Sequence, residues 1–167
     1  MKIGIISDTH SFLDENVLTY FKEVDEIWHA GDIGSLEVTQ QLEAKKKLRA
    51  VYGNIDNAEA RVQFPKYQIF AIDECKILLI HIAGSFGKYN YETQQLIKQH
   101  RPNILVCGHS HIVKVANDKK NNLLYINPGA AGIYGFHQVR TIIRFEIKNS
   151  KPTNMELIEL GKRGLVI

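Results

Sequence analysis

The sequence has only two cysteines and no hydrophobic run long enough to cross a bilayer. Cys75 and Cys107 form neither a C-x-x-C pair nor a disulfide framework, which favours a reducing compartment. A transmembrane helix needs about 20 consecutive apolar residues, and no segment approaches that length. Met1 leads directly into an apolar run, without the basic region and cleavage site of a signal peptide. These absences predict a cytoplasmic protein with no membrane partner.

No repeat, low-complexity tract or Pro/Gly/Ser-rich linker divides the 167 residues, which predicts a single domain over residues 1–167. The formal net charge is only +3. This small excess is compatible with phosphate-bearing ligands but argues against a nucleic-acid partner. The one basic run, Lys45 to Lys47, is expected to form the last turn of a helix. The oligomeric state stays open, a homo-oligomer included.

Apolar runs alternate with helical patterns in the first third of the chain. Strands are expected at 3–6, 26–30 and 48–52, with helices at 14–24 and 35–47 between them. Further strands are expected at 67–72, 76–80, 104–107, 112–116, 122–126, 139–147 and 155–160, with one helix at 90–101 and a loop at 148–154. Early β-α-β units followed by hairpins indicate an α/β fold with two packed sheets flanked by helices.

Side chains that commonly bind metals follow several apolar runs, at the point where each run ends. They are Asp8, His10, Asp32, Asn54, His81, His109 and His111. In α/β sheets, ligands bind in the crevice beyond the carboxyl ends of the strands. Residues two apart in an extended backbone point to the same side, so Asp8 and His10 are expected to share a face. Each residue alone has an ordinary structural explanation, but their joint occurrence at five strand ends predicts a metal centre.

The chemistry of this donor set narrows the choice of metal. It contains oxygen and nitrogen atoms but no thiolate, which favours Mn²⁺, Fe²⁺, Zn²⁺, Co²⁺ or Ni²⁺ over Mg²⁺ or Ca²⁺. Mn²⁺ is the leading candidate. Gly31, Gly53 and Gly108 each precede a group of these residues, which predicts sharp turns or close backbone approach at a crowded site.

The order of these motifs resembles a known family. Asp8-x-His10, Gly31-Asp32, Gly53-Asn54, His81 and Gly108-His109-x-His111 resemble the five-part signature of the calcineurin-like metallophosphoesterases. The opening ten residues and the turn at 127–129 resemble the small prokaryotic phosphodiesterase branch, which is related to the metallophosphoesterase-like subunit of eukaryotic retromer. The resemblance covers roughly residues 1–147. It implies a four-layer α/β/β/α sandwich of two mixed sheets, with two divalent transition-metal ions at its rim.

The resemblance also implies a role for each candidate ligand. Asp8, His10 and His111 would hold one metal, Asn54, His81 and His109 would hold the second, and Asp32 would bridge the two. The implied activity is that of a dinuclear metal-dependent phosphoesterase, in the first place a phosphodiesterase. A metal-bridging hydroxide would attack a small-molecule or nucleotide phosphodiester. The alternatives are a catalytically inactive scaffold of this fold that binds protein partners, and a nuclease.

The chain departs from the family pattern next to the motif asparagine. Many members place a histidine there, which can protonate the leaving group, whereas this chain has Ile55. We therefore expect a preference for substrates with good leaving groups. Asp56 completes the Gly-Asn-x-Asp pattern of the phosphodiesterase branch and is expected to fix the loop. The glycine-flanked loop at 84–89 is either a rim that reads the substrate or an ordinary connection.

The remaining polar side chains of interest have structural explanations. His29 is expected to be packed or hydrogen-bonded, and His100 and His137 are expected at the surface. Cys107 is expected to be a buried, inert thiol. Arg61 could bind phosphate, but a surface pair is the simpler interpretation.

Overall fold

A computed structural model describes residues 1–164 as two packed β-sheets with helices outside them. The first sheet contains β1 (Lys2–Ile6), β2 (Glu26–His29), β3 (Lys47–Ala50), β11 (Val139–Lys148) and β12 (Lys151–Lys162), in the order β12-β11-β1-β2-β3. The second contains β4 (Tyr67–Ile72), β5 (Cys75–Ile80), β8 (Ile104–Val106), β9 (Lys114–Asp118) and β10 (Leu123–Asn127), in the order β4-β5-β8-β10-β9. Both sheets are mixed.

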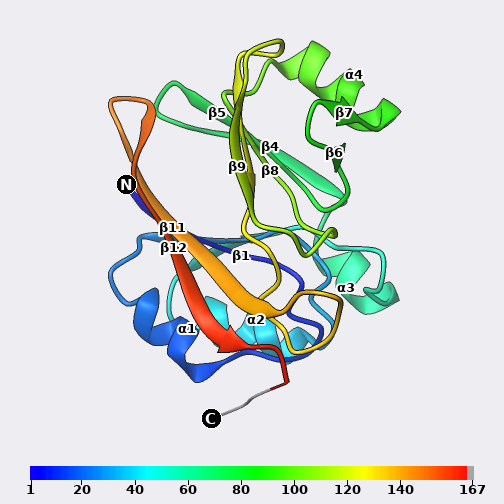
Figure 1. Ribbon diagram of the computed structural model, residues 1–167, viewed down its shortest axis with the longest axis vertical. Helices are drawn as coiled ribbons and strands as arrows, with labels where there is room; N and C mark the ends of the chain where they lie inside the picture. Colours follow the sequence, from blue (N-terminus) through cyan, green and yellow to red (C-terminus); the bar gives the residue numbers. More distant parts are fainter. Residues whose placement is uncertain (165–167) are drawn as a thin grey trace.

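Four layers result from this arrangement (Figure 1). The helices α1 (Glu15–Tyr20) and α2 (Leu36–Glu43) pack on the outer face of the first sheet, and α4 (Tyr91–His100) packs on the outer face of the second. α3 (Ala58–Gln63) and the small hairpin of β6 (Gly84–Ser85) and β7 (Lys88–Tyr89) lie at one side of the sandwich. The predicted α/β/β/α sandwich is confirmed. Within residues 1–164, no helix is long and apolar enough to cross a bilayer.

The core between the sheets comes from the alternation of side chains along the strands. Ile3 and Ile5 of β1 point inward and pack with residues of the second sheet, while Ile6 packs with the helices outside. Trp28 lies fully buried at the centre and makes edge-to-face contacts with Phe70 (5.1 Å) and Phe145 (5.7 Å). Because Phe70 belongs to the second sheet, Trp28 joins the two sheets directly.

The helices begin at polar caps but are shorter than the sequence pattern predicts. Asp14, Ser35 and Asn90 accept hydrogen bonds from the first turns of α1, α2 and α4. The expected last helical turn at Lys45 to Lys47 is wrong, because α2 ends at Glu43 and Lys47 begins β3. Sequence analysis also missed α3, whose six residues are too few for a clear helical period.

The loop expected at residues 148–154 is wrong as well. β11 and β12 form a long hairpin in which Lys148 pairs with Lys151 across a two-residue turn. Asn149 (φ 51°) and Ser150 (φ 61°) both have left-handed backbone there. Two successive positive φ angles are what a tight hairpin turn requires. The last strand consequently runs from Lys151 to Lys162 rather than from 155 to 160.

A buried carboxylate fixes the edge of the first sheet. The side chain of Glu26, at the start of β2, is fully buried and contacts Lys47 (2.5 Å), Arg49 (3.0 Å) and the indole Nε1 of Trp28 (3.0 Å). Burial alone would raise the pKa of Glu26, but the hydrogen bonds from these three donors outweigh it and hold the pKa below its usual value.

Glu26→Gln should destabilise the fold by about 1–3 kcal/mol at pH 7, because the charged partners lose their carboxylate. A carboxyl whose pKa is lower in the folded protein stabilises the fold at pH values above its ordinary pKa of 4.5. This stabilisation is lost as the pH falls through the pKa of the folded state. The difference from the wild type should therefore shrink below about pH 4.5. Urea unfolding at several pH values measures it. Glu23→Gln, at an exposed neighbouring position, is the matched control; an equal effect of both variants would contradict the interpretation.

Candidate metal centre

The carboxyl ends of the parallel strands of both sheets meet along one edge, called the rim below. β1, β2 and β3 run parallel in the first sheet, and β5, β8 and β10 run parallel in the second. Within the first sheet, the amide of Asp8 donates to the carbonyl of Gly31 (3.0 Å). Across the sheets, the amide of His109 donates to the carboxylate of Asp8 (3.1 Å). The loops at the rim are therefore linked to one another.

The rim brings together all seven of the candidate ligands named above. A first cluster contains Asp8, His10 and His111, whose donor atoms lie within 4.8 Å of one another. Asp8 is fully buried, and its Oδ1 lies 3.2 Å from Nε2 of His111. The rings of His10 and His111 meet edge to face at 5.4 Å. These three side chains come from the loops after β1 and β8.

A second cluster contains Asp32, His81 and His109, again with donor atoms within 4.8 Å of one another. Nε2 of His81 lies 3.2 Å from Oδ1 of Asp32 and 3.2 Å from Oδ1 of Asn54. The rings of His81 and His109 meet edge to face at 5.3 Å. Asn54 thus lies beside the second cluster.

Asp32 lies between the two clusters and presents a different oxygen to each. Its Oδ1 faces His81 of the second cluster (3.2 Å), and its Oδ2 faces Nε2 of His10 in the first (3.7 Å). Nε2 of His10 is buried and has no hydrogen-bond partner in the described chain. A buried polar atom without a partner is costly, so this nitrogen needs a ligand.

A hydrogen bond at the outer side of the His81 imidazole decides which of its nitrogens faces the second cluster. Nδ1 of His81 lies 2.7 Å from the carbonyl of Ala30, which can only accept. In neutral His81, Nε2 is then an unprotonated nitrogen that faces two oxygens. Such an arrangement is repulsive unless a proton or a cation lies between them.

The pKa values of this pair follow from the same geometry. Burial lowers the pKa of His81, but its hydrogen bond to Asp32 and the nearby carboxylates outweigh burial and raise the pKa above its usual value. Burial raises the pKa of Asp32, but its interactions with His81, the amide of Ile55 and His10 together outweigh burial and lower the pKa. The position between these side chains therefore stabilises positive charge. The donor atoms, their spacing and this charge preference all fit a divalent metal ion.

His137 contacts the first cluster, and its expected surface position is wrong. It is 9 % exposed and lies in the loop between β10 and β11. Nε2 of His137 lies 2.9 Å from the carbonyl of Gly132, and its Nδ1 lies 3.3 Å from Nδ1 of His111. With Nε2 donating to Gly132, Nδ1 of His137 accepts from His111 and directs Nε2 of His111 to Asp8. Its only sequence signal was a histidine outside every apolar run.

The physical reason given for the shared face of Asp8 and His10 is wrong, although they do belong to one cluster. Both have left-handed backbone, with φ of 53° and 47°, and not the extended backbone of a strand. His109 (φ 68°) and His111 (φ 57°) are likewise left-handed and point to different clusters. Non-glycine residues with positive φ are uncommon and gather at functional sites.

All three motif glycines are required by close contacts, as the sequence predicts, and a Cβ at Gly31 would lie 2.7 Å from Cβ of His81. A Cβ at Gly53 would collide with Oδ1 and the amide of Asp32. A Cβ at Gly108 would collide with the hydroxyl of Ser7 and lie 2.7 Å from Oδ2 of Asp8. Any larger residue at these positions would displace a candidate ligand.

Asp56 fixes the loops that carry Asp32 and Asn54, which confirms the expectation that it holds the loop. Its carboxylate accepts from the amides of Gly53 (2.7 Å), Gly34 (2.8 Å) and Ile33 (3.2 Å). Arg61, expected in a surface pair, instead donates to the carbonyls of Asp56 (2.8 Å) and Asn54 (3.1 Å). The loop after β3 is thus held from both sides.

The other singled-out side chains behave as expected. His29 is fully buried, and burial lowers its pKa to about 4, so it stays neutral while it contacts Thr9 (3.0 Å) and the amide of Gly31 (3.2 Å). Burial raises the pKa of the Cys107 thiol to about 12, which confirms an inert cysteine. Neither residue points into the clusters.

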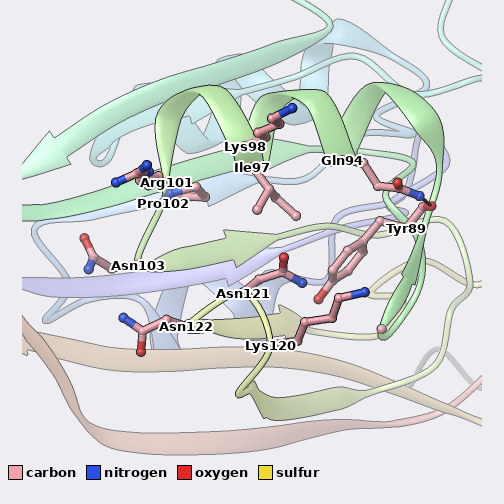
Figure 2. A pocket seen from close by; sticks show the side chains of 11 residues that line it. Tyr89, Gln94, Ile97, Lys98, Arg101, Pro102, Asn103, Lys120, Asn121 and Asn122 are labelled. Atoms are coloured by element: carbon pink, nitrogen blue, oxygen red, sulfur yellow. Dashed lines mark hydrogen bonds between the residues drawn. The ribbon is translucent and has the colours of Figure 1, made fainter.

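Two cavities flank the centre. One of about 450 Å³ is lined by Asn54 and His81, and another of about 430 Å³ begins at His109. A third, of about 570 Å³, lies away from the rim, between α4 and the turn that joins β9 to β10 (Figure 2). Two of its polar side chains are bonded within the protein: the Tyr89 hydroxyl donates to Asp118 (2.8 Å), and the Gln94 side-chain amide donates to the carbonyl of Tyr89 (2.6 Å).

Comparison with known proteins gives consistent results. The family model for the calcineurin-like phosphoesterase superfamily domain matches residues 1–150. A probable metallophosphoesterase of Methanocaldococcus jannaschii is 32% identical over 136 residues, covering 78% of this chain and 68% of that one. A phosphodiesterase of the same organism is 27% identical over 145 residues, covering 77% and 83% of the two chains.

Solved structures share the fold at lower identity. Wild-type Vps29 of Entamoeba histolytica, solved in complex with zinc, superposes with a TM-score of 0.73 at 18% identity, covering 96% of this chain and 99% of that one. The match over most of the sequence shows the family, and it confirms the predicted class of enzyme, a phosphoester hydrolase. The chain belongs to the calcineurin-like phosphoesterase superfamily.

Proposed function

We propose that this chain is a dinuclear metal-dependent phosphodiesterase whose metals are held by the seven residues at the rim. Asp8, His10 and His111 hold one ion, and Asn54, His81 and His109 hold the other. Asp32 is shared between them. The observation that supports this division most directly is the position of Asp32, whose two oxygens face His10 and His81 on opposite sides.

Two divalent ions at these positions would supply Lewis acidity toward a phosphate oxygen and toward the attacking water. The residues of the chain fix where that chemistry takes place. Asp56 and Arg61 hold the loop of Asn54, and His137 holds the ring of His111. Ile55, 45 % exposed beside Asn54, has no proton to give to a leaving group. The substrate must therefore carry a leaving group that departs as a stable anion.

A phosphodiester is favoured over a phosphomonoester by the charges around the site. A monoester carries one more negative charge, which additional free cations would stabilise. Both cations that line the 450 Å³ cavity are already bound within the protein. Arg61 donates to two backbone carbonyls, and Lys66 forms an ion pair with Glu92 (2.7 Å). The phosphodiesterase relative from Methanocaldococcus jannaschii supports the same choice.

Removal of metal should abolish hydrolysis of an activated phosphodiester such as bis(p-nitrophenyl) phosphate, and Mn²⁺ or a similar ion should restore it. Asp8→Asn should lower kcat by at least about 100-fold, because the weaker ligand disturbs the ion that Asp8 holds and the second ion, which shares Asp32 with it. Release of p-nitrophenol measures this effect. Asp73→Asn, at the exposed turn between β4 and β5, is the matched control. Near-full activity of Asp8→Asn would refute the assignment.

His137→Ala should weaken metal binding by about 10- to 100-fold, because the residue that orients a metal-binding histidine contributes that much. Calorimetric titration of the chelator-treated protein with Mn²⁺ measures this change independently of catalysis. His137→Gln keeps an acceptor for His111 and should recover part of the affinity. His100→Ala, at the end of α4, is the control. Unchanged affinity in His137→Ala would contradict a role in orienting His111.

A further inference from the structure

The cavity beside His109 differs in character from the metal centre that it adjoins. It encloses about 430 Å³, within the usual range for small-molecule sites. Its walls are formed by Ile82, Phe86, Ile112 and Tyr125, and Lys114 is the one lysine or arginine among the described residues that line it. An apolar, partly aromatic cavity thus opens directly from the proposed catalytic centre.

Phe86 lines this cavity from the tight turn between β6 and β7. β6 and β7 pair through Ser85 and Lys88, which leaves Phe86 and Gly87 as a two-residue turn. Gly87 has φ of 75°, a left-handed conformation that tight turns place on glycine. The ring of Phe86 meets Tyr125 of β10 edge to face at 5.5 Å. The hairpin therefore places an aromatic ring opposite a buried one.

The base of this hairpin is fixed to the start of α4. The side-chain amide of Asn90 donates to the carbonyl of Ile82 (2.7 Å), and its backbone amide donates to the carbonyl of Ala83 (3.0 Å). A Cβ at Gly84 would lie 2.7 Å from the amide nitrogen of Asn90, so glycine is needed for this approach. The position of Phe86 is accordingly built into the fold.

Apolar side chains of the cavity are exposed beside candidate metal ligands. Ile82 follows His81 and is 38 % exposed, and Ile112 follows His111 and is 67 % exposed. Phe86 is 36 % exposed. Exposed apolar groups gathered at one site commonly mark a binding surface. Nζ of Lys114 lies 5.4 Å from the centroid of the Phe86 ring, which adds a positive charge at the cavity wall.

We propose that this cavity is a substrate subsite that takes an aromatic group attached to the scissile phosphate, with Phe86 as the contact that determines specificity. Lys114 would favour an aromatic group that carries a further anionic substituent. The occupant follows from continuity with the metal centre: the cavity begins at His109, and its size suits one aromatic ring system. The proposal rests on the proposed function, since the phosphate must first be held by the metals.

Binding of two methyl phosphonate esters, which carry the single negative charge of a phosphodiester, to the Mn²⁺-loaded protein tests the subsite without relying on turnover. Methyl phenylphosphonate should bind about two- to tenfold more tightly than methyl methylphosphonate, the gain expected for an aromatic contact. Phe86→Ala should remove this difference. Tyr91→Ala replaces an exposed aromatic residue that does not line the cavity, and it should keep the difference. Calorimetry gives the Kd values, and circular dichroism checks folding.

The outcomes separate the subsite from the metal centre. If both phosphonates bind the wild type with equal affinity, the metal centre stands and the aromatic subsite is refuted. A phenyl preference that survives Phe86→Ala would also refute it. If neither phosphonate binds, the proposed function itself fails and the subsite fails with it.

The role of Lys114 has its own readout. The methyl ester of 4-carboxyphenylphosphonate, with its carboxylate free, should bind about two- to fivefold more tightly than methyl phenylphosphonate, the range expected for a solvent-exposed ion pair. Lys114→Ala should remove that gain. Lys120→Ala, in the cavity of Figure 2 away from the rim, is the matched control and should retain it. A gain retained in Lys114→Ala, or lost equally in Lys120→Ala, would contradict the assignment of Lys114.

Discussion

The rim depends on backbone that is held in an uncommon conformation by neighbouring loops. Five candidate ligands have positive φ, namely Asp8, His10, Asp32, His109 and His111. Left-handed backbone costs about 1–2 kcal/mol for each such residue. The amide of Asp8 donates to Gly31 (3.0 Å) and that of His10 to Asp32 (3.1 Å), so adjacent loops hold one another in place. The donor atoms converge only when both sheets are packed.

Convergence brings a second constraint, because it buries carboxylates and imidazole nitrogens close together. Asp8 and Asp32 are buried carboxylates, and Nε2 of His10 is buried without a hydrogen-bond partner in the described chain. The outer hydrogen bond of His81 to Ala30 turns its second nitrogen toward oxygens. Both constraints point to a cation as the group that completes the site.

Much of this site could be predicted from sequence because strand ends are visible in sequence. Apolar runs mark β1, β2, β5 and β8, and polar residues follow each of them in a fixed order. The glycines were informative as well, because a Cβ at Gly53 or Gly108 would collide with neighbouring residues of the rim. The backbone of Asp8 and His10 was predicted incorrectly, because hydrogen bonds between distant loops set their φ angles and no local pattern records those bonds.

Features set by tertiary contacts escaped prediction. His137 gave no periodic signal, and its contact with His111 depends on the path of the loop after β10. α3 is too short to show a period, and no local pattern separates the two-residue turn at Asn149 and Ser150 from a longer loop. The 84–89 loop was left undecided between a rim and a connection, since its aromatic contact with Tyr125 joins segments 39 residues apart (86 and 125).

The central claim is that two metal ions lie at the rim and share Asp32. Crystals grown with Mn²⁺, measured on both sides of the manganese absorption edge, would locate the ions by anomalous scattering. We expect two peaks in each chain, about 3.5–4 Å apart, one beside Asp8 and His111 and the other beside His81 and His109. A single peak at the rim, or peaks only elsewhere on the chain, would contradict the dinuclear centre.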